Sequence, residues 1–383
     1  MEQRAALIRK LATIRGSTVI AFLTSVRPGV PAQISDDMVR VFFDHLALLP
    51  SRPIKKLDLF LCSNGGSGTV PWRLVSLFRE FADSFCVLIP YRAYSAASLL
   101  ALGADEIVMH PFAELGPIDP TVSNEFNPID QSGRRQGISV EDVTAYIHFI
   151  KTTVGIRHED ELVKAVEILA RKVHPLALGN VERFLSQSRM IATKILRTHM
   201  TEETDAHKIS EIVENLASKL YFHGHPINRK EAGKDIGLKV KLDLPPDLEA
   251  GMWDLYKEYE VEFDNLSVFN PAMDIAALQA TQPQAPIQPV PVPTQPVGAP
   301  AQPVQVQLAF PPPLIKDYTI PHAIIESDRL SSKFVTKRRY TVLPLPLSPQ
   351  PGQPLIREDI LSQGWNHSSL PLAPPQPPPQ SKS

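Results

Sequence analysis

The sequence predicts an α/β protein with a parallel sheet, because short apolar runs alternate with segments of helical periodicity. The clearest unit is the apolar run LDLFLC (57–62), which breaks into SNGGSG (63–68) and is followed by apolar residues at helical spacing. Further strands are expected at 86–90 and 106–111, with a helix rich in small residues at 93–104 between them. In such sheets, loops and helix N-termini gather along one edge, where ligands bind.

The segments on either side extend this pattern. A short amphipathic helix is expected at 2–15, the first strand at 17–25, and a helix with an acidic first turn at 38–49. After residue 111, a segment rich in Pro, Gly, Asp and Asn predicts a surface loop with several turns. The half that follows is predicted to be mostly helical, with helices at 140–156, 159–173, 181–200, 205–220 and 248–263.

Composition divides the chain into a folded part and a tail. Most of the 38 prolines lie after Phe269, where aromatic residues become scarce. Such a segment cannot bury enough apolar surface to offset the entropy of ordering it, so we expect a disordered Pro-rich tail over 269–383. The rest is predicted to form one domain over 1–245, followed by a helical extension over 246–268 that is a possible oligomer contact.

Charge and cysteine content narrow the function. The net charge of −2 argues against nucleic acid, and the basic run at 337–339 is typical of a solvated patch. Cys62 and Cys86 both lie in apolar runs and form no disulfide framework, which favours a reducing compartment. The apolar segment 17–26 is too short to span a membrane. We therefore expect a soluble cytoplasmic protein without an integral membrane segment.

Metal chemistry has little support in the sequence. His223 and His225 lie close together, but no third ligand is nearby, and two such histidines are more often surface or capping residues. We expect neither a metal nor a cofactor.

A serine stands where a nucleophile would be needed. Ser95 lies between a strand and the N-terminus of the helix rich in small residues, where a hydroxyl is exposed at the sheet edge. Gly65 and Gly66 end the preceding strand, so their backbone amides should lie close to Ser95 and could stabilise an oxyanion. The alternative is structural, with the serine in a close-packed helix start and the glycines in an ordinary turn.

A nucleophilic serine also needs a base. We consider five candidates after Ser95, namely His110, His148, Lys151, Lys164 and His174. Lys151 is predicted on the edge of an apolar helix face, where desolvation would lower its pKa and let it accept the serine proton. The alternative is a solvated lysine on the flank of that helix.

Two motifs together resemble a known group of enzymes. SNGGSG followed by AYSAASLLALGADEIVMHPFAELGPIDP (93–120) resembles the Clp-protease and signal-peptide-peptidase A superfamily of serine peptidases. Within it, the chain is most similar to the serine dehydrogenase proteinase branch, which it resembles also at 174–189 and 223–240. The resemblance implies a ClpP/crotonase-like parallel sheet flanked by helices, and a protein or peptide substrate. It also implies a homo-oligomer, because members of this fold commonly form rings or dimers.

The resemblance also assigns roles to residues. It implies that Ser95 is the nucleophile, that Gly66 and Ala96 donate to the oxyanion, and that Gly65 supports the turn. AYIHFIK resembles the helix that carries the lysine base in the signal-peptide-peptidase branch, so Lys151 would be the base. One departure is that the usual Ser-Ala-Gly or Ser-Gly-Gly is Ser95-Ala96-Ala97 here, which leaves Ser98 as an alternative nucleophile.

We therefore predict a serine endopeptidase with a Ser95 and Lys151 dyad. One alternative is a crotonase-like acyl-CoA enzyme, for which Glu114 and Asp119 would be the nearby acidic residues. Another is a non-catalytic oligomeric scaffold whose Pro-rich tail recruits partners through polyproline II segments.

Overall fold

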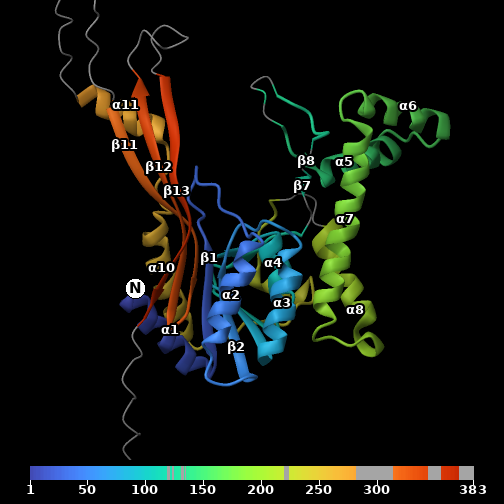
Figure 1. Cartoon of the computed structure of the whole chain (residues 1–383). Helices are drawn as coiled ribbons and strands as arrows, with labels where there is room; N and C mark the ends of the chain where they lie inside the picture. The colour runs from blue at the N-terminus through green and yellow to red at the C-terminus, as the bar shows by residue number, and fades with distance from the viewer. Residues whose placement is uncertain are drawn as a thin grey trace, which may run out of the picture.

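A twisted eight-stranded sheet runs through the molecule, as the computed structural model shows (Figure 1). The structure describes residues 1–118, 121–122, 125–130, 133, 135–219, 224–281, 314–343 and 355–370. The strand order is β10-β5-β3-β2-β1-β11-β12-β13. Its parallel part consists of β1 (Thr18–Thr24), β2 (Ile54–Cys62), β3 (Ala82–Ile89), β5 (Glu106–Met109) and β10 (Val240–Lys241). The predicted α/β class with a parallel sheet flanked by helices is therefore confirmed.

Helices cover both faces of this parallel part. One face is covered by α2 (Asp37–Ala47), α3 (Val70–Phe81) and α4 (Ala96–Ala101), and the other by α1 (Glu2–Arg15) and α10 (Pro246–Phe263). Because side chains alternate along a strand, Ile20 and Phe22 of β1 enter the first core whereas Ala21 and Leu23 enter the second. Burial on both sides explains why these strands appear in the sequence as continuous apolar runs.

The segment after β5 is mainly helical, as expected. It contains α5 (Val140–His148), the π-helix η1 (Phe149–Thr153), α6 (Glu159–Ala170), α7 (Pro175–Leu196), α8 (Glu202–Glu214), the π-helix η2 (Asn215–Lys219) and α9 (Arg229–Lys234). Two small sheets accompany it, β4 (Arg92–Ala93) with β6 (Glu114–Leu115) and β9 (Ile227–Asn228), and β7 (Thr121–Val122) with β8 (Ile138–Ser139). In the described part of the chain, no helix combines the length and apolar character needed to cross a membrane.

Helix α10 packs against α1 and the sheet. Its apolar stripe, which includes Leu248, Tyr256 and Phe263, is buried inside the chain. Only the opposite side of α10 is therefore open to the oligomer contact that the sequence suggested for this segment.

The C-terminal part of the chain corrects one prediction. α11 (Pro271–Thr281) is followed by β11 (Leu314–Glu326), β12 (Leu330–Leu343) and β13 (Leu355–Ser369), and β11 pairs antiparallel with β1. The expectation of a disordered tail from Phe269 onwards is wrong for these residues, which complete the central sheet. The physical reason is that β1 offers an edge whose backbone groups β11 can pair with. Residues 282–313, 344–354 and 371–383 lie outside the described residues.

A buried ion pair fastens β11 to the helices on one face. Glu326 is fully buried at the end of β11, and Arg4 of α1 donates from Nε to its Oε2 at 2.7 Å. The Tyr259 hydroxyl of α10 donates to the same oxygen at 2.8 Å. Arg4 also bonds Glu262, which in turn pairs with Lys333 of β12. The C-terminal strands are therefore joined to α1 and α10 by charged groups as well as by apolar contacts.

A buried histidine joins the other face to β12. His45 of α2 is only 1% exposed, with Nε2 at 3.0 Å from the Ser332 hydroxyl and Nδ1 at 3.3 Å from the Ser327 hydroxyl. Burial, assisted by the nearby His367, lowers the pKa of His45 to about 3. The imidazole is therefore neutral in the folded chain at any pH near neutrality.

This depressed pKa predicts a loss of stability in acid. Between pH 6.5 and about 3, His45 binds a proton in the unfolded chain but not in the folded chain. The free energy of unfolding should therefore fall by about 1.4 kcal/mol per pH unit across this window from His45 alone, and the contribution should be constant above pH 6.5. Urea titrations of wild type and His45→Asn at pH 7 and pH 4.5 measure it. Equal pH dependence in the two proteins would contradict the assignment.

Candidate active site

Ser95 occupies a strained backbone conformation at the turn between β4 and α4. Its φ of 53° and ψ of −116° lie outside the regions that residues with a Cβ normally adopt. Hydrogen bonds on either side fix the turn, from Tyr94 N to Ser63 O (3.0 Å) and from Ala97 N to Tyr94 O (2.9 Å). A strained serine on a tight turn from strand to helix has the geometry of a nucleophile elbow, which exposes the hydroxyl at the sheet edge.

The two glycines that follow β2 lie directly against this turn. A Cβ on Gly65 would lie 2.6 Å from Tyr94 O and 2.9 Å from Ser95 Cβ, so no other residue fits there. A Cβ on Gly66 would lie 2.4 Å from the backbone N and O of Ile34. Both glycines also have positive φ, 99° and 150°. The structure thus brings Gly65 and Ser95 into contact, as their positions in the sequence suggested.

Two backbone amides near Ser95 are free. Ala96 is the first residue of α4, where helix amides have no intrahelical acceptor. In the part of the chain that the structure describes, neither its N–H nor that of Gly66 donates to another group. By contrast, Gly65 N donates to the Ser63 hydroxyl at 3.0 Å. Gly66 and Ala96 therefore remain available as the predicted donors to an oxyanion, and Gly65 as the support of the turn.

The alternative nucleophile Ser98 is committed to structure. Its Oγ lies 2.7 Å from the carbonyl oxygens of Ala93 and Gly116, and it accepts a hydrogen bond from Gly116 N at 3.2 Å. The side chain is only 2% exposed. Ser98 therefore ties α4 to β4 and β6, and its hydroxyl does not face a substrate.

Sequence reasoning missed two residues that shape the glycine turn. The buried Ser63 hydroxyl accepts from Gly65 N and lies 2.7 Å from the Thr24 hydroxyl, which joins the ends of β1 and β2. Ile34 donates from its N–H to Gly65 O and accepts from Ser67 N, both at 2.8 Å. Ser63 could have been noticed as a hydroxyl directly before the glycines, but nothing local in the sequence indicates the role of Ile34.

The predicted base, Lys151, makes no hydrogen bond with Ser95 among the described residues. Lys151 lies on η1 and is exposed, so the desolvation expected from the apolar helix face is not present. Among the described residues, no side chain makes a hydrogen bond with the Ser95 hydroxyl. The dyad of Ser95 and Lys151 therefore stays a prediction.

The other candidate bases have separate roles or face solvent. His110 stacks on Trp253 at 5.2 Å between ring centroids, and its Nδ1 accepts from Phe112 N. The Nδ1 of His174 accepts from Leu176 N and caps α7. His148 and Lys164 are exposed.

The structure describes some, but not all, of the residues that were considered for acyl-CoA and metal chemistry. Glu114 accepts a hydrogen bond from the Tyr94 hydroxyl, and burial together with this bond raises the pKa of Tyr94. Asp119 and His223 lie outside the described residues, while His225 Nε2 lies 2.7 Å from Glu231 Oε1. Within the described ranges, no group of three or more His, Cys, Asp and Glu side chains could hold a metal ion.

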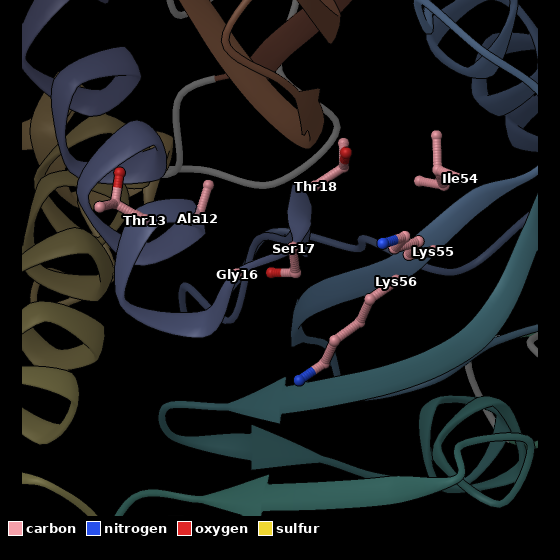
Figure 2. Close-up of a pocket in the computed structure, with 8 residues that line it drawn as sticks. All are labelled: Ala12, Thr13, Gly16, Ser17, Thr18, Ile54, Lys55 and Lys56. Atoms are coloured by element: carbon pink, nitrogen blue, oxygen red, sulfur yellow. The ribbon is translucent and has the colours of Figure 1, made fainter. Parts of the chain in front are cut away.

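A shallow hollow of about 360 Å³ lies elsewhere on the sheet (Figure 2). It is lined by Ala12, Thr13, Gly16, Ser17, Thr18, Ile54, Lys55 and Lys56. These residues surround the amino ends of β1 and β2, whereas Gly65 and Ser95 follow the carboxyl ends of parallel strands. Ligands of such sheets bind at the carboxyl ends, so the hollow is not part of the candidate active site.

The parallel sheet and the serine elbow define a ClpP-like α/β protein. Residues 1–163 match the model of the family described as ClpP-like SDH-type serine proteinase. For this part of the chain, the match confirms the family that the sequence motifs indicated, which is one of serine proteinases.

Individual relatives are distant. Two uncharacterized proteins of Methanocaldococcus jannaschii are 25% identical over 253 residues and 24% identical over 265 residues. These alignments cover 63% and 67% of this chain, and 73% and 79% of the relatives. Two solved structures of the 1510-N membrane-bound stomatin-specific protease, both mutants and one with a substrate peptide, are 16% and 17% identical with a TM-score of 0.25. Each of these two structural alignments covers 36% of this chain. They cover 62% and 58% of the protease chains, so this chain spans less than two thirds of either.

Proposed function

We propose that this chain hydrolyses peptide bonds with Ser95 as nucleophile and Lys151 as general base. The Ser95 hydroxyl attacks the substrate carbonyl while neutral Lys151 accepts its proton, and the N–H groups of Gly66 and Ala96 bind the oxyanion. Lys151 then gives the proton to the departing amine, leaving an acyl-enzyme. Water, deprotonated by Lys151, attacks this ester and releases the second product, which returns Ser95 to its starting state.

The strained turn of Ser95 against Gly65 is the observation that carries this proposal. Backbone strain of this kind persists only where the surrounding structure enforces it, and it is concentrated at functional sites. The family match over residues 1–163 supports the same chemistry. An extended substrate at the sheet edge could use main-chain hydrogen bonds for affinity, which fits a peptide of varied sequence.

Lys151 has to become shielded from solvent to act as base. It is exposed on η1, and π-helical turns are frequently found at functional sites. The proposal therefore requires η1 to close over Ser95 when substrate binds, since only a desolvated lysine has a pKa low enough to take the proton.

A fluorophosphonate probe tests the nucleophile directly. Such a probe reacts with a serine that is activated and flanked by oxyanion donors, so we expect one covalent label per chain on Ser95. Peptide mapping by mass spectrometry locates the label. A label on another serine, or no label at a probe concentration that saturates a known serine peptidase, would refute the proposed function.

Replacing Lys151 with alanine should lower kcat for peptide hydrolysis by about 10²- to 10⁴-fold, the usual contribution of a general base. Lys151→Arg should be equally impaired, because arginine cannot lose its proton near neutral pH. Steady-state hydrolysis of an unfolded protein substrate measures the effect, with the exposed Lys164→Ala as the matched control that keeps wild-type activity. Wild-type activity in Lys151→Ala would assign the base to another residue.

A further inference from the structure

His322 lies at an irregularity in β11. Pro321 is paired with Val335 of β12 and Ala323 with the preceding residue, Phe334, so His322 itself has no partner across the ladder. Such a β-bulge turns one side chain out of the regular alternation, and bulges are frequent beside active sites.

His322 holds both ends of one loop. Its backbone carbonyl accepts from Ser25 N at 2.8 Å, directly after β1. Its Nδ1 lies 2.9 Å from Pro31 O, and because a carbonyl can only accept, Nδ1 carries the proton. The residue is 7% exposed, and burial lowers the pKa of the imidazole. Loop 25–31 is therefore fixed at its start and at its end by a single residue of β11.

The same loop leads into the glycine turn of the candidate active site. Three residues after Pro31, Ile34 donates to Gly65 O and accepts from Ser67 N, both at 2.8 Å. These two bonds lie on either side of Gly66, whose Cα has no room for a side chain against Ile34. The position of Ile34 therefore sets the orientation of the Gly66 peptide and the direction of its free N–H.

Residues after α10 hold the rest of the loop. Phe269 N donates to Pro28 O at 2.8 Å, and Arg27 Nε donates to Ser267 O at 3.1 Å. Among the described residues, the anchors of this loop that lie outside it, including His322, come after residue 163, where the family match ends.

We propose that His322 is a positioning residue for the active site and that β11 thereby contributes to catalysis. By fixing loop 25–31, it holds Ile34 against the glycine turn and keeps the Gly66 amide directed at the oxyanion. The inference rests on the proposed function, because it gives the C-terminal strands a role in the same reaction. These strands would then contribute to catalysis as well as completing the sheet.

Two substitutions of His322 separate positioning from packing. His322→Leu keeps apolar bulk but cannot donate to Pro31 O, whereas His322→Asn places an amide nitrogen near the position of Nδ1. We expect His322→Leu to lower kcat and the rate of fluorophosphonate labelling by about tenfold to a hundredfold, as displaced catalytic groups do. His322→Asn should stay within about threefold of wild type. Ile324→Val, a buried change two residues along β11, should lower the melting temperature without slowing labelling.

Amide hydrogen exchange gives a second measurement that does not depend on activity. In His322→Leu, the amides of Ile34 and Ser67 should exchange at least about tenfold faster than in wild type, and in Ile324→Val they should not. Wild-type labelling and exchange in His322→Leu would overturn the inference, as would slowed labelling in Ile324→Val. Faster exchange in His322→Leu, with no label on Ser95 in the wild type, would support the coupling of His322 to the glycine turn and overturn the proposed function.

Discussion

Replacing Ser95 with alanine should abolish peptide hydrolysis and fluorophosphonate labelling, and replacing it with glycine should do the same while stabilising the fold. The loss of activity should be about 10⁴-fold or more, as when a serine nucleophile is removed. The gain in stability follows from the backbone, because φ 53° and ψ −116° are costly for any residue with a Cβ but not for glycine. Relative to Ser95→Ala, we expect Ser95→Gly to raise the free energy of unfolding by about 1 kcal/mol.

Urea unfolding of the two variants, together with hydrolysis of an unfolded protein, tests both parts. Ser98→Ala is the matched control from the same helix. It should lose stability, because the buried bonds of the Ser98 hydroxyl with the carbonyl oxygens of Ala93 and Gly116 would be lost, but it should still be labelled at Ser95. If Ser95→Gly were no more stable than Ser95→Ala, the turn would not be strained, and the main structural support for a nucleophile at this position would disappear.

The sequence was sufficient to predict four of the five parallel strands, all but β10, and the placing of the glycine turn. Each of these features depends on residues that are close together in the sequence, such as the apolar run 57–62 and the glycines Gly65 and Gly66 that follow it. The same local pattern of strand, turn and helix placed Ser95 at the helix start, but the strain of its backbone is seen only in the structure. Local patterns of this kind are clear in the sequence because the strands are buried on both faces and the turn has room for no residue larger than glycine.

Features that depend on distant parts of the chain could not be predicted in this way. The composition after Phe269 is dominated by proline, which conceals three strands, the first of which pairs with the distant β1. The contact of His322 with Pro31 joins residues 291 positions apart. The exposure of Lys151 likewise depends on where η1 lies relative to distant parts of the chain, which the sequence does not specify.

Removing the Glu326 carboxylate should cost about 3–5 kcal/mol of unfolding free energy, the second large effect that we expect. In Glu326→Leu, the buried Arg4 guanidinium would lose its principal partner, and the Tyr259 hydroxyl would lose its acceptor. Arg4 would keep only the partly exposed Glu262 as an ionic partner, and a buried charge without its main partner is expensive, because burial has removed the water that would otherwise solvate it. Chemical denaturation at pH 7 and low salt measures this cost.

The double variant Arg4→Leu, Glu326→Leu separates the ion pair from the packing around it. Because it leaves no unpaired charge, it should be less destabilised than Glu326→Leu alone, with the unpaired Tyr259 hydroxyl accounting for part of the remaining loss. A double variant as unstable as the sum of the two single variants would mean that Arg4 and Glu326 act independently.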